Sequence, residues 1–150
     1  MKRAILSLVT LATAGCISPL EPDVGDLMVE ECDNADNDPS VTVSFSKNLL
    51  KKLFNLQPNT CSHCHDPSAP TPIGYEYGGY DMSTYDGVMA GGVNSGPHMV
   101  VPGRPCESFL YLKLTPSPPV GSRMPWTGPY YDESDMATLT DWIAEGANDN

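Results

Sequence analysis

The stretch TCSHCHDP, Thr60–Pro67, places Cys61 and Cys64 three positions apart and His65 directly after the second thiol. Three chemistries use such a pattern: a dithiol redox pair, half of a zinc site, and covalent attachment of a c-type haem. The residues around this stretch decide among them.

Two of these chemistries find little support elsewhere in the chain. A dithiol redox pair sits on a βαβ framework, whereas a helical pattern and Pro58 precede Cys61 and no βαβ pattern occurs. A zinc site needs two further ligands at suitable spacing. The remaining candidates, Cys32, His98 and Cys106, all lie far from the motif.

Haem attachment accounts for every position of the motif. The thiols of Cys61 and Cys64 would form thioethers with the two vinyl groups, and His65 would be held under the iron as an axial ligand. Covalent haem attachment in bacteria takes place outside the cytoplasm, so an exported chain suits this chemistry. The sequence therefore predicts one covalent haem c.

The N-terminus is typical of an export signal. Lys2 and Arg3 precede an apolar run over residues 4–14, which is too short to span a bilayer. The run ends in Ala14-Gly15-Cys16, which resembles a lipobox, although Thr13 stands where leucine is usual. An ordinary signal cleaved after Ala14 or Gly15 is the alternative. We predict a lipoprotein-type signal peptide over residues 1–15 and lipid on Cys16, as the only membrane attachment.

The charge is strongly acidic, with 8 basic and 19 acidic residues and a net charge of −11. Loss of the signal would bring it to about −13, which excludes nucleic acid as a partner and favours proteins with basic patches. Residues 16–40 are acidic and contain no Lys or Arg, so we predict an acidic tether there. The run DNADND within it lacks the glycine and the closing glutamate of a calcium loop. A single domain is expected over residues 41–150.

The expected elements are helices separated by long loops. A helix capped by Ser44 or Ser46 precedes the motif, and a final helix begins at Asp132 or Ser134 and stops at Gly146. Shorter segments are expected near residues 83–89 and 107–114, and the proline-rich stretch 116–129 excludes a regular element. No strand pattern persists. The sequence predicts a mostly α fold that needs something large to pack against.

A second axial ligand is expected from one of the loops. Met124 lies in GSRMPWTGP, where the following proline stiffens a loop that can present the sulfur atom. His98 and Met99, on a glycine-rich stretch, remain alternatives.

From about Phe45 to Asn150 the chain resembles a monohaem cytochrome c domain of the class I type, similar to exported domains of planctomycetes and myxobacteria. The segments that carry the resemblance are CSHCH, YDMSTYDGVMAGG, VVPGRPCESFLYLKL, SRMP and LTDWIAEGANDN. The resemblance implies the cytochrome c fold, in which the helix before CSHCH crosses the C-terminal helix. It also implies His65 and Met124 as the two iron ligands.

One departure from this family pattern is Cys106, where an acidic or polar residue is usual. Cys106 is therefore expected to pair with Cys32 in an oxidising compartment, with two free thiols as the alternative. Arg123 and Trp126 flank Met124, and either contact a haem propionate or belong to the rim of an ordinary loop.

These features favour an exported one-electron carrier with a single His/Met-ligated haem, periplasmic or on the cell surface, with the outer membrane favoured. Its expected partners are redox proteins with basic docking patches. The alternatives are a peroxidase-like enzyme with an open distal haem site, and a haem-bearing module of a larger cell-surface complex.

The lipid assignment predicts the behaviour of Cys16→Ser. Because serine cannot take the thioether-linked lipid, this variant should leave the membrane fraction and become soluble outside the cytoplasm. Fractionation followed by immunoblotting measures this. A variant that stays as membrane-bound as the parent would show that another feature holds the protein there.

Overall fold

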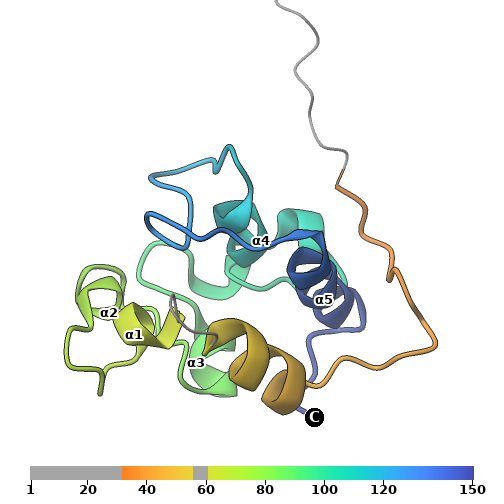
Figure 1. Cartoon of the computed structure of the whole chain (residues 1–150), viewed down its shortest axis with the longest axis horizontal. Coiled ribbons are helices and arrows are strands. Elements are labelled where there is room, and N and C mark those ends of the chain that lie inside the picture. The colour runs from red at the N-terminus through yellow and green to blue at the C-terminus, as the bar shows by residue number, and fades with distance from the viewer. Residues whose placement is uncertain (1–31, 56–60) are drawn as a thin grey trace, which may run out of the picture. The chain divides into compact units, whose positions relative to one another are not determined.

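The computed structural model describes residues 32–55 and 61–150, and within these ranges it contains helices and no strand. The mostly α prediction is therefore confirmed. The predicted signal peptide, Cys16 and residues 16–31 of the predicted tether lie outside the described residues. The elements, shown in Figure 1, are η1 (Phe45–Phe54), α1 (Cys61–His65), α2 (Ile73–Gly78), α3 (Tyr85–Ala90), η2 (Gly96–His98), η3 (Pro105–Glu107), α4 (Phe109–Leu114) and α5 (Glu133–Ala144).

The first helix, η1, is a π-helix, whose i→i+5 hydrogen bonds give a wider turn than that of an α-helix. Ser44 is its N-cap, with the hydroxyl accepting a hydrogen bond from the Lys47 N–H. Its buried side chains are Phe45, Leu49, Leu53 and Phe54. A spacing of four or five residues between buried positions matches the wide turn and places them on one face. The same spacing also suits an ordinary α-helix, so the sequence predicted the helix but not its width.

The last helix, α5, packs against η1 to form the centre of the hydrophobic core. Asp132 caps its first turn by accepting from the Asp135 N–H. Trp142 is fully buried, and its ring centroid lies 5.6 Å from that of Phe45. The Trp142 indole N–H donates to the Asn148 carbonyl at 2.9 Å, so the polar edge of this large side chain is also satisfied. The contact between η1 and α5 is the one that the resemblance implies.

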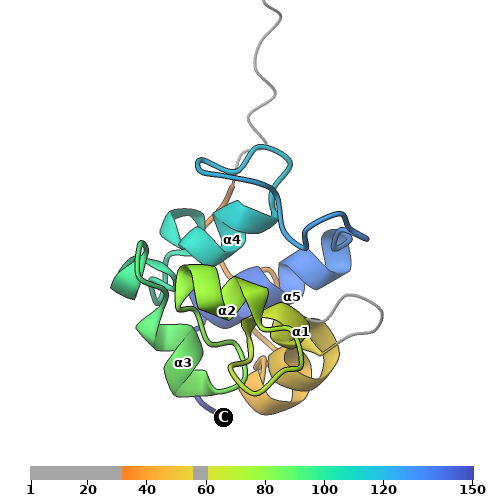
Figure 2. The same cartoon turned by 90° about the vertical axis from the view of Figure 1, so that its left-hand side faces the viewer.

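The middle of the chain contains more helix than the sequence predicted. The predicted helix near residues 83–89 corresponds to α3, and the stretch before it contains α1 and α2. Figure 2 shows α2 in front of α5, with α4 and α3 on either side of it in this view. No regular element lies between the end of α4 and the start of α5, as the prolines there predicted. Within the described ranges, no helix is both long enough and apolar enough to cross a membrane.

The segment before η1, residues 32–43, is bonded along the domain rather than separate from it. The backbone N–H and the side-chain amide of Asn37 both donate to Asp141, at 2.8 and 2.7 Å. The Val43 N–H donates to the Glu145 carboxylate. The contacts of the domain therefore begin before the predicted boundary at Val41. Side-chain amides and carboxylates hold this acidic segment, and its composition alone does not reveal such bonds.

A disulfide joins Cys32 to Cys106, the pairing that the sequence analysis favoured, with 5.7 Å between the Cα atoms. This separation is within the normal range for a disulfide. The Cys106 N–H donates to the Asn34 side chain at 3.0 Å, which adds a second contact at the same place. The bridge ties the start of the described chain to η3.

Loss of this disulfide should destabilise the domain. The bridge spans 74 residues of sequence, so opening it gives the unfolded chain considerably more conformational freedom. Cys106→Ser paired with Cys32→Ser should lower the free energy of unfolding by about 2–5 kcal/mol. Denaturant unfolding of parent and double variant measures this. Equal stabilities would contradict the assigned stabilising role.

Candidate functional site

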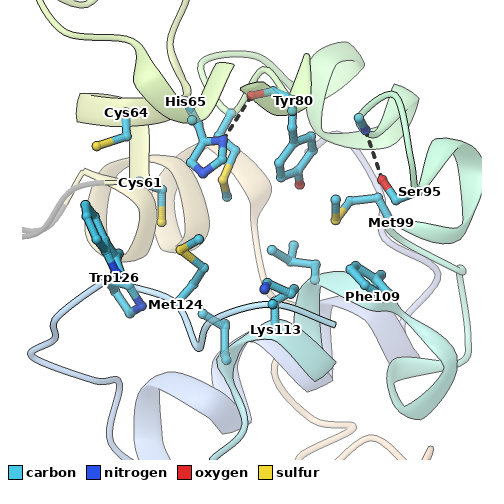
Figure 3. Close-up of a pocket in the computed structure, with 18 of the residues that line it drawn as sticks. Cys61, Cys64, His65, Tyr80, Ser95, Met99, Phe109, Lys113, Met124 and Trp126 are labelled. Carbon is cyan, nitrogen blue, oxygen red and sulfur yellow. Dashed lines mark hydrogen bonds between the residues drawn. The ribbon is translucent and has the colours of Figure 1, made fainter. Parts of the chain in front are cut away.

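A cavity of about 870 Å³ lies between α1, α2, α4 and the loop that leads to α5. Its volume is within the roughly 300–1,000 Å³ of typical small-molecule and cofactor pockets. Apolar side chains form most of its wall, and all of CSHCH except Ser62 lines it. Figure 3 shows Cys61, Cys64 and His65 at the cavity.

The imidazole of His65 is oriented by the backbone of the segment that follows α2. Its Nδ1 lies 3.2 Å from the Tyr80 carbonyl oxygen. A carbonyl only accepts hydrogen bonds, so Nδ1 carries the proton and Nε2 keeps its lone pair. The Met82 N–H donates to the His65 carbonyl at 2.8 Å, which ties the same two segments a second time. Burial lowers the pKa of His65 and keeps the ring neutral, the form that binds metals.

Gly74 in α2 packs directly on this imidazole. A Cβ atom built at Gly74 would lie 2.7 Å from both Cε1 and Nε2 of His65. Real side chains do not approach so closely, so only glycine allows α2 to cover the ring in this position. The contact restricts the ring in addition to its hydrogen bond.

The two thiols of the motif, Cys61 and Cys64, are both unpaired and line the cavity. The Cys61 sulfur lies 3.2 Å from the Tyr131 hydroxyl, which donates to the Leu53 carbonyl at 2.7 Å. Since the phenol proton is used for Leu53, the thiol donates to the phenol oxygen. Burial raises the pKa of Cys61 to about 11. Tyr131 therefore connects this thiol to the end of η1.

Of the three predicted candidates for a second ligand, two line the cavity. Met124 is held by its N–H, which donates to the Lys113 carbonyl at 2.8 Å, and its sulfur lies across the cavity from His65 (Figure 3). Met99 also lines the cavity but lies beside Tyr80, further from His65. His98, in η2, is not among the lining residues.

Arg123 and Trp126, for which a propionate contact and a place on the rim of an ordinary loop were the two alternatives, are placed differently from each other. Trp126 lines the cavity and is 65% exposed. Arg123 is not among the lining residues. Its Nε donates to the Leu114 carbonyl at 2.7 Å, and its guanidinium lies 3.9 Å from the centroid of the Tyr130 ring. The geometry therefore gives no support to a propionate contact by Arg123, because the Leu114 carbonyl at the end of α4 and the Tyr130 ring already hold its side chain.

Several contacts of the site were not predicted from the sequence. Gly74 and the Tyr80 carbonyl hold the imidazole, and Tyr131 holds the first thiol. Lys113 lines the cavity and donates to the Val120 and Ser122 carbonyls. Lys113 lies four residues after Phe109, another lining residue, so helical spacing could have identified it. A glycine inside the short helix α2 was the only signal for Gly74.

The residues present fit a covalent haem. Two free thiols lie at one side of an apolar cavity, a neutral imidazole has Nε2 available, and a methionine sulfur lies opposite. This arrangement is the one expected of a c-type haem domain. Residues 61–126 match the family model of planctomycete cytochrome C. The match includes both CSHCH and Met124, and it supports a cytochrome c-type domain in this chain. No curated protein and no solved structure gave a significant match.

The packing of Gly74 on His65 predicts the effect of Gly74→Ala. The added methyl group must displace the imidazole or α2, which should destabilise the domain by about 1–3 kcal/mol and disturb the spectrum of the haem protein. Thermal unfolding and absorption spectroscopy measure these effects.

Gly78→Ala is the matched control in the same helix. A Cβ there meets no protein atom within 4 Å, so this variant should be as stable as the parent or slightly more so. If the two variants behave alike, the close packing of Gly74 on the imidazole is not what restricts the ring.

Proposed function

We propose that this protein is an exported one-electron carrier with a single haem c, attached through Cys61 and Cys64 and ligated by His65 and Met124. The observation that carries the proposal is the placement of the His65 ring and the Met124 sulfur on facing sides of one apolar cavity, with both thiols at its edge. The match to planctomycete cytochrome C supports the haem-binding and electron-transfer part of it.

The residues of the chain each have a defined part in this function. When bound, a haem of this kind takes up and releases one electron at its iron. The Nε2 lone pair of His65 faces the cavity because Tyr80 holds the opposite nitrogen. Met124 offers a neutral sulfur, and such a ligand favours the ferrous state and raises the reduction potential. The apolar wall favours the form with less charge, which raises the potential further.

Location and partners follow from the sequence features outside the cavity. We propose a periplasmic or cell-surface protein, anchored by lipid on Cys16 at the outer membrane. The net charge of −11 favours redox partners with basic patches. Such contacts are weak, form rapidly and are sensitive to salt, which suits an electron carrier that must leave its partner.

Covalent attachment predicts a coloured chain that keeps its haem after denaturation. Protein expressed with a haem-attachment system should retain its colour through acidified organic extraction, with a mass increase of one haem. Cys61→Ser and Cys64→Ser should each lose one thioether, which shifts the absorption of the pyridine haemochrome. Haem that is extracted from the parent, or zinc found in its place, would contradict the proposal.

Ligation by Met124 predicts three changes in Met124→Ala. The potential should fall, the iron should bind carbon monoxide, and the sulfur-to-iron charge-transfer band of the oxidised protein should disappear. These changes follow because the variant loses the neutral sulfur and opens one face of the iron. Potentiometry and absorption spectroscopy measure them.

Met99→Leu and His98→Ala are the controls and should both keep the band. If Met124→Ala keeps it and Met99→Leu loses it, Met99 is the ligand. A parent protein that lacks the band and binds carbon monoxide freely would favour a peroxidase-like enzyme over an electron carrier.

A further inference from the structure

The hydroxyl of Tyr80 is a buried polar group without a partner. Tyr80 is only 5% exposed, and in the described part of the chain its hydroxyl is the one buried side-chain nitrogen or oxygen that makes no hydrogen bond. Buried polar groups nearly always have a partner, because leaving one unpaired is unfavourable. A group with this placement indicates an acceptor that comes from outside the chain.

The position of this hydroxyl restricts what the acceptor can be. Tyr80 lines the cavity, and Figure 3 shows its ring reaching into the cavity on the side away from Cys61 and Cys64. Those thiols would bind the edge of a haem that carries its vinyl groups. The two propionates leave the macrocycle away from that edge, and their carboxylates are the only oxygen acceptors that the haem carries.

A cation is available for the same carboxylates. Among the described residues that line the cavity, Lys113 is the only lysine or arginine. Its ammonium donates to the Val120 carbonyl at 2.8 Å and to the Ser122 carbonyl at 2.5 Å. An ammonium has three N–H donors, so a third remains for a carboxylate. In a chain of net charge −11, a carboxylate at this edge of the cavity would be stabilised by such a counter-charge.

We propose that the Tyr80 hydroxyl donates a hydrogen bond to a haem propionate and that Lys113 compensates the propionate charge. This inference rests on the proposed function and extends it to the polar edge of the cofactor. It assigns to Tyr80 and Lys113 the role that the sequence analysis considered for Arg123 and Trp126.

The assignment gives Tyr80 one contact with His65 and one with the haem. Its carbonyl orients the His65 imidazole below the iron, and its hydroxyl holds a carboxylate at the periphery. The two thioethers would already set the rotation of the haem, so the hydroxyl would secure the carboxylate rather than orient the macrocycle. Tyr80 is thus a cofactor-binding residue through its side chain and a positioning residue through its backbone.

The first test uses the unaltered haem-loaded protein. In proton NMR spectra of the ferrous state, the ring protons of Tyr80 should show nuclear Overhauser contacts with the propionate methylene protons. Contacts with the thioether methyl groups instead would overturn the proposal.

The second test compares Tyr80→Phe with Tyr85→Phe in the haem-loaded protein. The propionate bending mode in the resonance Raman spectrum should shift in Tyr80→Phe, because the carboxylate loses a donor. Tyr85→Phe is the matched control, since the Tyr85 hydroxyl donates to the Ala147 carbonyl and does not line the cavity. An unchanged propionate mode in Tyr80→Phe would overturn the assignment, whether or not the sulfur-to-iron band persists.

Lys113 is tested through charge. Lys113→Gln should lower the reduction potential, because the uncompensated carboxylate favours ferric iron, whereas Lys113→Arg should stay close to the parent. The sulfur-to-iron band should persist in both, which separates this effect from a displaced Met124. If Lys113→Gln leaves the potential unchanged, the cation has no such role.

These outcomes distinguish the inference from the proposed function. A parent without covalent haem overturns both. A parent with haem whose propionate mode is insensitive to Tyr80 overturns only the inference. A propionate mode that shifts in Tyr80→Phe, in a protein whose sixth ligand is not Met124, supports the inference and contradicts that part of the proposed function.

Discussion

Two hydrogen bonds between His65 and the segment after α2 are the constraint on which the site depends. The Nδ1–H of His65 donates to the Tyr80 carbonyl, and the His65 carbonyl accepts from the Met82 N–H. Together they fix the tautomer and the direction of the imidazole relative to the backbone. Gly74 then closes on the ring from α2, and no larger residue would allow this approach. The short helices α1 and α2 therefore hold the His65 imidazole in a single orientation.

The site is coupled to the hydrophobic core through Tyr131. Its hydroxyl contacts the first thiol of the motif and donates to the Leu53 carbonyl near the end of η1. The buried face of η1 packs against α5, where Phe45 meets Trp142. These contacts form a continuous path from the packing of the two helices to Cys61. The core does more than stabilise the fold, since it also sets one edge of the cavity.

The sequence predicted those parts of the site whose chemistry depends on side-chain type. Thiols and an imidazole in CSHCH have few other uses together, and the prolines around Met124 mark a loop that presents a side chain. The carbonyl of Tyr80 could not be predicted in this way, because every residue carries one and only the path of the chain selects it. The contacts of Arg123 also depend on that path. The hydrogen bonds of residues 32–40 could not be predicted for a related reason, since an acidic composition describes charge but not which amide or carboxylate finds a partner.

The bridge between Cys32 and Cys106 also limits how far the domain can stand from a surface to which its N-terminus is attached. A chain spans at most about 3.3–3.6 Å per residue, whatever its conformation. Counted from Cys16 to a domain that began at Val41, the contour length is roughly 85–90 Å. The contour length from Cys16 to Cys32 is only about 55 Å, and Cys32 is joined to η3 by the disulfide. With the proposed lipid on Cys16, this shorter reach would restrict the domain to partners in the layer next to its membrane.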